Sequence, residues 1–140
     1  MFKDHAGFKE LTHNALRIVA GFLFTLHGAQ KLFGVLGGSK VEVMSTMGVA
    51  GILEFFGGIM MMAGLLTAPV AFLIAGQMAV AYFWRHAPQG FWPVGRGGAG
   101  NGGELAAFYC FTWLFFCAHG AGKYSIDGWL ACRKRQAAEE

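Results

Sequence analysis

Long apolar stretches, separated by short polar or glycine-rich segments, dominate the chain. A helix that crosses the hydrocarbon core of a membrane needs about 20 mainly apolar residues. The stretch 16–36 has this length, and no charged residue occurs between Glu54 and Arg85. A single straight helix over that second region would overshoot the membrane, so the pattern predicts two helices there.

The sequence "LLTAP" marks the division between these two helices. Thr67 is a residue type that caps helices, and Pro69 suits a first helical turn. We therefore expect spans at 49–66 and 68–84, joined by a tight turn. A glycine-rich loop follows at 87–103, and the last span is expected at 105–122, where Gly-Ala-Gly is a helix stop.

The alternative to a membrane protein is a soluble four-helix bundle. A soluble helix has a polar face that repeats about every 3.6 residues, and neither "GGIMMMAGLL" nor "CFTWLFFCA" has one. Charged residues make up 14% of the chain, whereas roughly 25% is usual in soluble domains. The sequence therefore predicts an all-α bundle of four transmembrane helices, with residues 1–140 forming a single domain in the lipid bilayer.

The charges of the chain indicate its orientation and exclude one class of partner. The formal net charge is +3, and no basic run interleaves with aromatic residues as in nucleic-acid-binding proteins. Lys and Arg are more frequent on the cytoplasmic side of membrane proteins. Seven of them lie on the side of the two termini in the predicted topology and four on the other side, which predicts that both termini are cytoplasmic.

The sequence "LHGAQKLFG", 26–34, places three polar side chains in the last turns of the first apolar stretch. They either end the helix in water or face the interior of the bundle. Their i, i+3, i+4 spacing puts them on one helix face, and the other predicted helices carry polar groups at a similar depth near the outer side. The predicted polar pocket comprises His27, Gln30, Lys31, Glu54, Arg85, His86 and Glu104, with Gln77 placed deeper.

The two charges expected deepest in this pocket need partners. A charge in the hydrocarbon costs about 2.5–3.5 kcal/mol on insertion scales. Lys31 and Glu54 lie at similar depths on consecutive antiparallel helices, so we expect them to form an ion pair. Three interpretations stay open: a structural pair that fixes the bundle register, a ligand pocket or proton path, and long side chains that reach back to water.

A quinone is the ligand whose requirements the pocket meets most directly. His27 or Gln30 would donate hydrogen bonds to its carbonyl groups, and aromatic walls would come from Phe55, Phe83, Trp84 and Phe108. A haem would need two axial ligands at one depth, for which His27 and His86 are the candidates. The Glu-x-x-His pairs of di-iron bundles are absent from the sequence. We predict no metal site and no resident cofactor, apart from a bound quinone or lipid.

The remaining chemically active motifs predict no catalysis. Cys110 and Cys117 are about 10 Å apart along one helix, which is too far for a disulfide. They and Cys132 are expected to act as ordinary small side chains. The sequence "GRGGAG", 95–100, resembles a dinucleotide fingerprint but lacks the strand and helix around it, so it predicts a flexible loop.

The motifs "LHGAQKLFG", "EFFGG", "HAPQGFWP", "NGGE" and "GKYSIDGWL" occur in this order within the predicted spans. Together they resemble the DoxX family of small bacterial four-helix membrane proteins, over residues 17–130. The resemblance implies an inner-membrane location. It also implies a set of matching polar positions: His27, Gln30, Lys31, Glu54, His86, Asn101, Glu104 and Asp127. The family takes its name from a relative associated with thiosulfate:quinone oxidoreductase, and other relatives are linked to oxidative-stress complexes.

Two functions follow from the residues and the resemblance together. The favoured hypothesis is an accessory subunit of a larger membrane complex, respiratory or redox, or of a homo-oligomer, because the chain has no electron-transfer motif of its own. The alternative is a quinone-linked oxidoreductase component in which His27 and Gln30 hold the head group and Glu54 handles protons. The sequence leaves open whether the protein is an enzyme.

Overall fold

The computed structural model describes residues 5–95 and 100–139, and all the regular elements in them are helical. The helices are α1 (His5–Phe33), α2 (Thr46–Ala63), α3 (Thr67–Ala81), α4 (Glu104–His119) and α5 (Ile126–Glu139), with a π-helical turn η1 (Tyr82–His86) and a 3-10 turn η2 (Ala87–Gln89) after α3. The all-α prediction is confirmed. Residues 96–99 of the "GRGGAG" motif lie outside the described residues.

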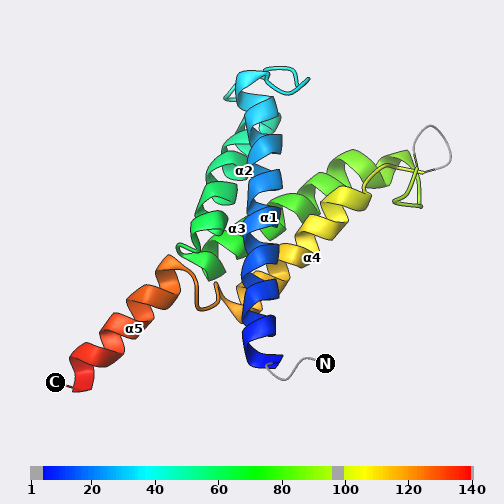
Figure 1. Cartoon of the computed structure of the whole chain (residues 1–140). Coiled ribbons are helices and arrows are strands. Elements are labelled where there is room, and N and C mark those ends of the chain that lie inside the picture. The colour runs from blue at the N-terminus through cyan, green and yellow to red at the C-terminus, as the bar shows by residue number, and fades with distance from the viewer. Residues whose placement is uncertain (1–4, 96–99, 140) are drawn as a thin grey trace.

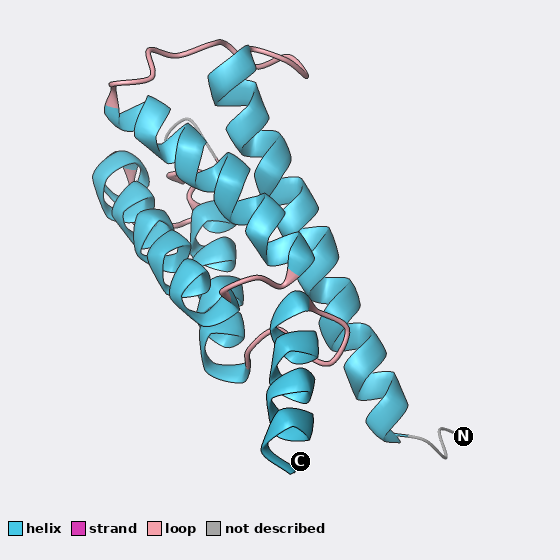
Figure 2. Cartoon of the chain, turned by 90° about the vertical axis from the view of Figure 1, so that its left-hand side faces the viewer, coloured by secondary structure: helices cyan, strands magenta, loops and turns pink. Residues whose placement is uncertain are grey.

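The helices form two hairpins that diverge from one end (Figure 1). α1 packs along α2, and α3 packs along α4. The hairpins are joined by the short turn between α2 and α3, and from there each extends in its own direction (Figure 1). α5 stands apart at the end near this turn, as the second view also shows (Figure 2).

Glycines allow α1 and α2 to pack closely. A Cβ atom on Gly58 would lie 2.3 Å from the Thr25 hydroxyl and 2.6 Å from the Gly21 carbonyl oxygen. A Cβ atom on Gly28 would lie 2.7 Å from the Gly51 carbonyl oxygen. In each helix the two glycines are seven residues apart, so they lie on one face two turns apart. Small residues of this kind let membrane helices approach each other, and backbone packing then holds them together.

Aromatic side chains hold the two hairpins together. The Phe24 ring on α1 lies 5.1 Å, centroid to centroid, from the rings of both Tyr109 and Trp113 on α4. Tyr109 and Trp113 also stack on each other at 5.8 Å. Phe24, Trp113 and Met61 of α2 are almost wholly buried, so the hydrophobic core lies where the hairpins meet.

The helix boundaries follow the predicted spans with two differences. The predicted span 16–36 is part of the longer α1, which ends at Phe33 before a turn with positive φ at Gly34. No proline interrupts the preceding residues, so the helix continues back to His5. α5 was not expected as a helix. Its sequence is polar and lies beyond the apolar pattern from which the spans were predicted.

The start of α3 is capped differently from the prediction. The N-cap residue is Leu66, which has a left-handed φ of 49° and makes no side-chain cap hydrogen bond. Instead the carboxylate of Asp127, far along the chain, accepts hydrogen bonds from the backbone N–H groups of Leu66 at 2.9 Å and Thr67 at 2.8 Å. A negatively charged group near a helix N-terminus stabilises the helix, because the helix dipole is positive there. The expected capping role of Thr67 was therefore wrong.

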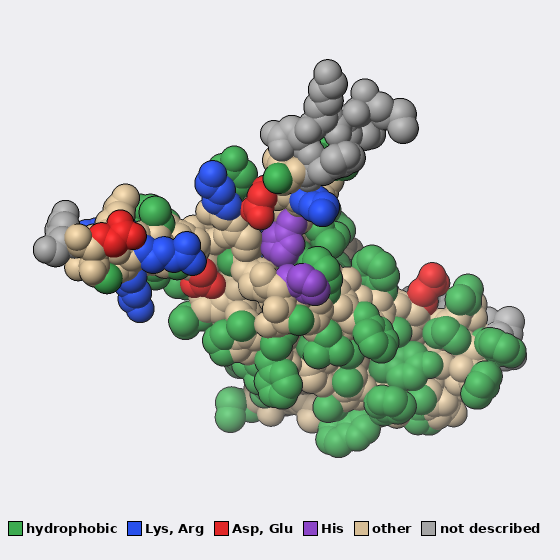
Figure 3. All heavy atoms as spheres, turned by 90° about the horizontal axis from the view of Figure 1, so that it is seen from below, with side chains coloured by type: hydrophobic (Ala, Val, Ile, Leu, Met, Phe, Trp, Pro, Cys, Tyr) green, Lys and Arg blue, Asp and Glu red, His purple; other side chains and the backbone are tan. Residues whose placement is uncertain are grey.

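Two helical stretches of the described residues are long and apolar enough to cross a membrane: Thr46–Ala63 and Thr67–Gln89. The apolar helix α4 is shorter, with 16 residues. Large apolar side chains such as Phe72 and Phe111 are exposed on these helices. In the view from below, hydrophobic side chains cover much of the bundle, whereas Lys and Arg side chains gather on the projecting α5 and around the base of the bundle (Figure 3).

Candidate ligand-binding site

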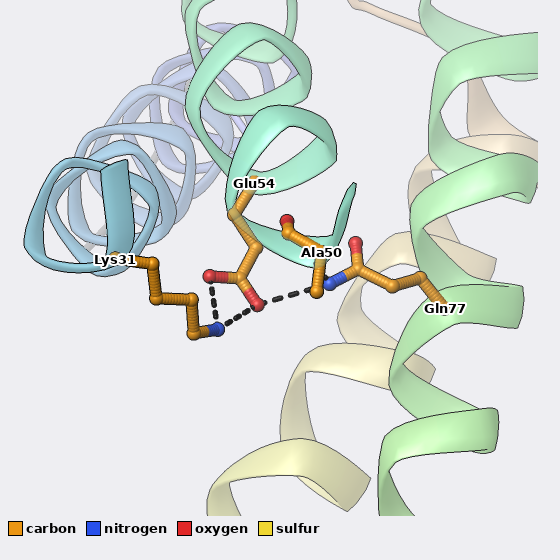
Figure 4. Close-up of polar contacts among 4 residues, drawn as sticks. All are labelled: Lys31, Ala50, Glu54 and Gln77. Carbon is orange, nitrogen blue, oxygen red and sulfur yellow. Dashed lines mark hydrogen bonds and ion pairs between the residues drawn. The ribbon is translucent and has the colours of Figure 1, made fainter. Parts of the chain in front are cut away.

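A buried ion pair joins the N-terminal half of α2 to the last turn of α1. The Lys31 ammonium group donates hydrogen bonds to both carboxylate oxygens of Glu54 (Figure 4). The Glu54 residue is 2% exposed, and the Lys31 side chain is 24% exposed. α1 and α2 come close enough for this contact because Gly51 has no side chain. A Cβ atom at that position would lie only 3.0 Å from the Cβ atom of Lys31. The predicted pairing is confirmed.

Gln77 connects this pair to the second hairpin. Its Nε2 group donates to Glu54 Oε1 at 2.9 Å and to the carbonyl oxygen of Ala50 at 3.4 Å (Figure 4). Charge-assisted hydrogen bonds of this kind stabilise the ionised carboxylate. The network therefore links α1, α2 and α3. Gln77 was expected to lie deeper than the pocket. In the sequence, the only indication that it has a polar partner is the presence of an amide side chain within a long uncharged run.

A cavity of about 960 Å³ lies between the two hairpins, with this network in its wall. Ligand pockets for drug-sized molecules range from about 300 to 1,000 Å³. The lining is mainly apolar and comes from all four helices of the hairpins. It includes Phe24, Ala50, Leu53, Phe72, Leu73, Met78, Val80, Ala81, Leu105 and Ala106. A few polar groups in an apolar chamber are typical of a site for an amphipathic molecule.

His27 and Tyr109 add two further polar groups to the lining. Their rings meet edge to face, with centroids 6.1 Å apart. Tyr109 is 5% exposed, and its hydroxyl makes no hydrogen bond to any other described residue. No pattern in the sequence indicated Tyr109, because a tyrosine in an apolar helix resembles any other core aromatic residue. The structure places it against Phe24 and His27 of α1.

The π-helical turn at the end of α3 brings Arg85 and His86 to the cavity. Such turns are rare and often occur at functional sites, because the wider turn redirects side chains. Arg85 is exposed, and His86 Nδ1 lies 3.0 Å from the carbonyl oxygen of Asn101. His86 also lines a smaller pocket of about 240 Å³ with Asn101 and Gln89.

The predicted polar residues divide into two groups. The cavity lining includes His27, Lys31, Glu54, Arg85 and His86 but neither Gln30 nor Glu104. The Gln30 amide donates to the carbonyl oxygen of Leu36 at 3.0 Å, so it binds the turn that follows α1. Glu104 is exposed at the first residue of α4. Helical spacing alone does not distinguish a side chain that lines a cavity from one that binds the next loop.

A second polar centre lies at the opposite end of the bundle, around Arg17. The guanidinium group is 1% exposed and donates to the carbonyl oxygens of Met61 at 2.6 Å, Tyr124 at 2.8 Å and Ala121 at 2.9 Å. It also donates to Asn14 Oδ1 at 3.1 Å. Arg17 is one of the seven Lys and Arg residues that the sequence places on the side of the two termini. In the structure it is buried, because it satisfies the carbonyl groups at the end of α2 and in the loop before α5.

Asp127 lies beside this centre and is a charged structural group. Burial alone would raise the pKa of Asp127, but hydrogen bonds from the backbone N–H groups of Thr67 and Leu66, together with the positive charge of Arg17, outweigh that effect. The pKa of Asp127 therefore lies below its usual value of 3.8. The residue matches a polar position of the DoxX pattern, and the structure places it at the α2–α3 turn rather than at the cavity.

These features define an all-helical membrane protein with a polar network set in an apolar cavity. The chain belongs to the DoxX family, whose model matches residues 13–87. It is 38% identical over 119 residues to an uncharacterized protein of Haemophilus influenzae, a match that covers 80% of this chain and 85% of the relative. No solved structure shows a significant match. The family match includes Lys31, Glu54 and Gln77, whereas Tyr109 lies beyond it.

Proposed function

We propose that this DoxX family protein binds the head group of a quinone in the cavity between its hairpins. The observation that carries the proposal is the buried Lys31–Glu54–Gln77 network in the wall of a large apolar cavity. An ion pair with a purely structural role would not require a cavity beside it. The size of the cavity and its mostly apolar lining suit a head group together with the start of an isoprenoid tail.

The free hydrogen-bonding groups match the carbonyl oxygens of a quinone. An ammonium group has three N–H donors, and Lys31 uses two acceptors on Glu54, so one donor is left for a ligand. His27, one turn before Lys31 on α1, and the Tyr109 hydroxyl on α4 supply further donors. Reduction of the quinone to a quinol takes up two electrons, which a partner subunit would supply, and two protons. The protons would come from water at the open side of the cavity and pass through the Lys31–Glu54 pair, which regains them from water afterwards.

The proposal includes a specific placement in the membrane. The two hairpins form one domain of four spans in the bacterial inner membrane, with both termini in the cytoplasm. Support comes from the exposed apolar side chains of the helices and from the larger number of Lys and Arg residues at the end that carries the termini. The mouth of the cavity, with Arg85 and His86, then lies toward the outer face.

An accessory subunit of a larger complex is the second candidate, and one observation favours it. Apolar side chains are exposed in the loops beyond the helix ends, among them Met44 at 88% and Phe91 at 83%. A partner protein or a second copy of this chain would cover such residues. In that case the cavity receives a helix of the partner rather than a small molecule.

Purification in a mild detergent, followed by mass spectrometry of the extracted lipids, tests the proposal. We expect quinone in near-stoichiometric amount with the wild-type protein and a strong reduction in the Glu54→Gln and His27→Ala variants. Gln30→Ala is the matched control, since Gln30 is on the same helix but outside the cavity lining. Wild-type protein that contains no quinone but retains a large partner would refute quinone binding and favour the accessory role.

A further inference from the structure

α5 is the one α-helix of the described residues that packs against no other helix over its length (Figures 1 and 2). None of its residues is buried. It is nevertheless firmly attached at its start. The backbone N–H of Asp127 donates to the carbonyl oxygen of Gly64 at 2.9 Å, and that of Gly128 donates to Ser125 Oγ at 3.0 Å. The helix therefore begins at a fixed position beside the ends of α2 and α3.

One face of α5 combines apolar and basic side chains. Ile126, Leu130, Arg133 and Ala137 follow at i, i+4, i+7 and i+11, and Trp129 lies next to them. Trp129 is 55% exposed although it is one of the largest side chains of the chain. Helices with an aromatic and aliphatic stripe next to Lys and Arg are typical of membrane interfaces.

The cations of this segment lie over aromatic rings. The Arg133 guanidinium carbon is 5.0 Å from the centre of the Trp129 ring, and Lys123 Nζ is 6.0 Å from the centre of the Tyr124 ring. Lys134 and Arg135 follow directly. Two carboxylates near this segment are engaged elsewhere: Asp127 accepts from the start of α3, and Glu10 accepts from the backbone N–H of Lys123 at 3.1 Å. Within α5, the three cations at 133–135 therefore outnumber the one other described acidic residue, Glu139.

We propose that α5 and residues 123–125 form a binding surface for the headgroups of anionic phospholipids in the adjacent leaflet. α5 begins where the apolar helix α2 ends, which is the level of a membrane–water interface for a spanning α2. Tryptophan and tyrosine prefer this level. Residues 133–135 lie about two turns further along, or about 10 Å, within reach of phosphate groups. Anionic lipid surfaces attract basic segments next to a membrane span.

A fluorophore on Cys132 tests this proposal in the full chain. Cys132 is exposed on α5, and Cys110→Ala with Cys117→Ala leaves it as the single thiol. The labelled protein is placed in nanodiscs of phosphatidylcholine, with or without phosphatidylglycerol. We expect phosphatidylglycerol to shift the emission to the blue and to reduce quenching by iodide, and we expect high salt to reverse both changes because it screens surface charges.

Charge variants supply the control. Arg133→Gln with Lys134→Gln and Arg135→Gln should abolish the response to phosphatidylglycerol, whereas Arg133→Lys with Arg135→Lys keeps the charge and should retain it. Equal emission in the two nanodiscs would overturn the proposal. A blue-shifted emission in both kinds of nanodisc that is unchanged in the glutamine variant would also overturn it. That result would mean that the fluorophore contacts protein and not the lipid surface. Neither outcome depends on a ligand in the cavity.

Discussion

At the scale of single residues, the most costly feature of the molecule is the nearly inaccessible carboxylate of Glu54. It is stable because Lys31 and Gln77 approach it from two different helices. Removal of one partner from a buried ion pair leaves an uncompensated charge, which is far less favourable than removal of both. The two charges therefore contribute to stability mainly as a unit.

We predict that Lys31→Met lowers the free energy of unfolding by about 3–5 kcal/mol, as expected for a buried ion pair that loses one partner. Lys31→Met combined with Glu54→Gln should recover much of this loss, because the pair is then removed together. Denaturation of each variant in detergent measures the effect. Additive losses in the double variant would mean that the two side chains do not interact in the folded protein.

Asp127 gives a prediction for acid stability. Its pKa is lowered in the folded protein, so its stabilising contribution is complete above the usual value of 3.8 and is lost as the pH falls through the lower, folded value. Between the usual value and the lower folded value, wild-type protein should lose stability more steeply than Asp127→Asn as the pH falls. At neutral pH, Asp127→Ala should cost about 0.5–2 kcal/mol, the range for a helix cap replaced by alanine. Thermal unfolding across the acid range measures both, and parallel curves would contradict the capping role.

Single residues also show where sequence reasoning succeeds and where it ends. The pairing of Lys31 with Glu54 followed from depth and helix order, both of which the apolar pattern supplies. The burial of Arg17 and the position of Tyr109 did not, because each depends on contacts with residues more than 80 positions away. Gln30 shares a helical face with His27 by spacing, yet it binds a loop whose path the sequence does not reveal.

At the scale of the elements, the contact between α1 and α2 depends on matched glycines. Gly21 faces Gly58, and Gly28 faces Gly51, across an antiparallel crossing. The apolar pattern predicted the order of the helices and the approximate positions of the spans, but not the extension of α1 back to His5. It could not identify α5 or the cap that Asp127 provides to α3, since a polar helix leaves no apolar run and a cap from the far end of the chain leaves no local motif.

Two glycine substitutions separate close packing from ordinary helix propensity. Gly58→Ala should destabilise the protein by about 1–3 kcal/mol, as overpacking does, because the new Cβ atom would overlap the backbone of α1. Gly76→Ala is the matched control on α3, where a Cβ atom would meet nothing within 4 Å. It should be neutral or stabilising by up to about 1 kcal/mol, from helix propensity. Equal effects on the melting temperature would remove the case for a glycine-dependent contact.

At the scale of the whole molecule, two hairpins are joined at one end and diverge from it (Figure 1). An open cavity lies between them, lined by residues from all four helices. The hairpins are held together by the aromatic core around Trp113 and by the Arg17 centre near the α2–α3 turn. The division into hairpins explains how a small chain keeps a cavity of about 960 Å³ without losing its core. The apolar pattern predicted the helices but not the angle between the hairpins, which depends on side-chain packing.

The proposed topology predicts different labelling of the two ends in intact cells. Single cysteines at Ser39 and Ala137, in a variant without the native cysteines, are treated with a thiol reagent that does not cross the membrane. Position 39 should react, whereas position 137 should react only after the cells are opened. Labelling of position 137 alone in intact cells would show that the orientation is reversed.

The most direct test of quinone binding is photolabelling with an azido-quinone in native membranes, followed by peptide mapping. We predict that the adducts lie on cavity-lining residues such as Phe24, His27 and Tyr109, that excess unmodified quinone prevents them, and that Glu54→Gln reduces them. Adducts spread over exposed side chains outside the cavity, such as Phe111 and Phe22, and insensitive to competition, would contradict the account.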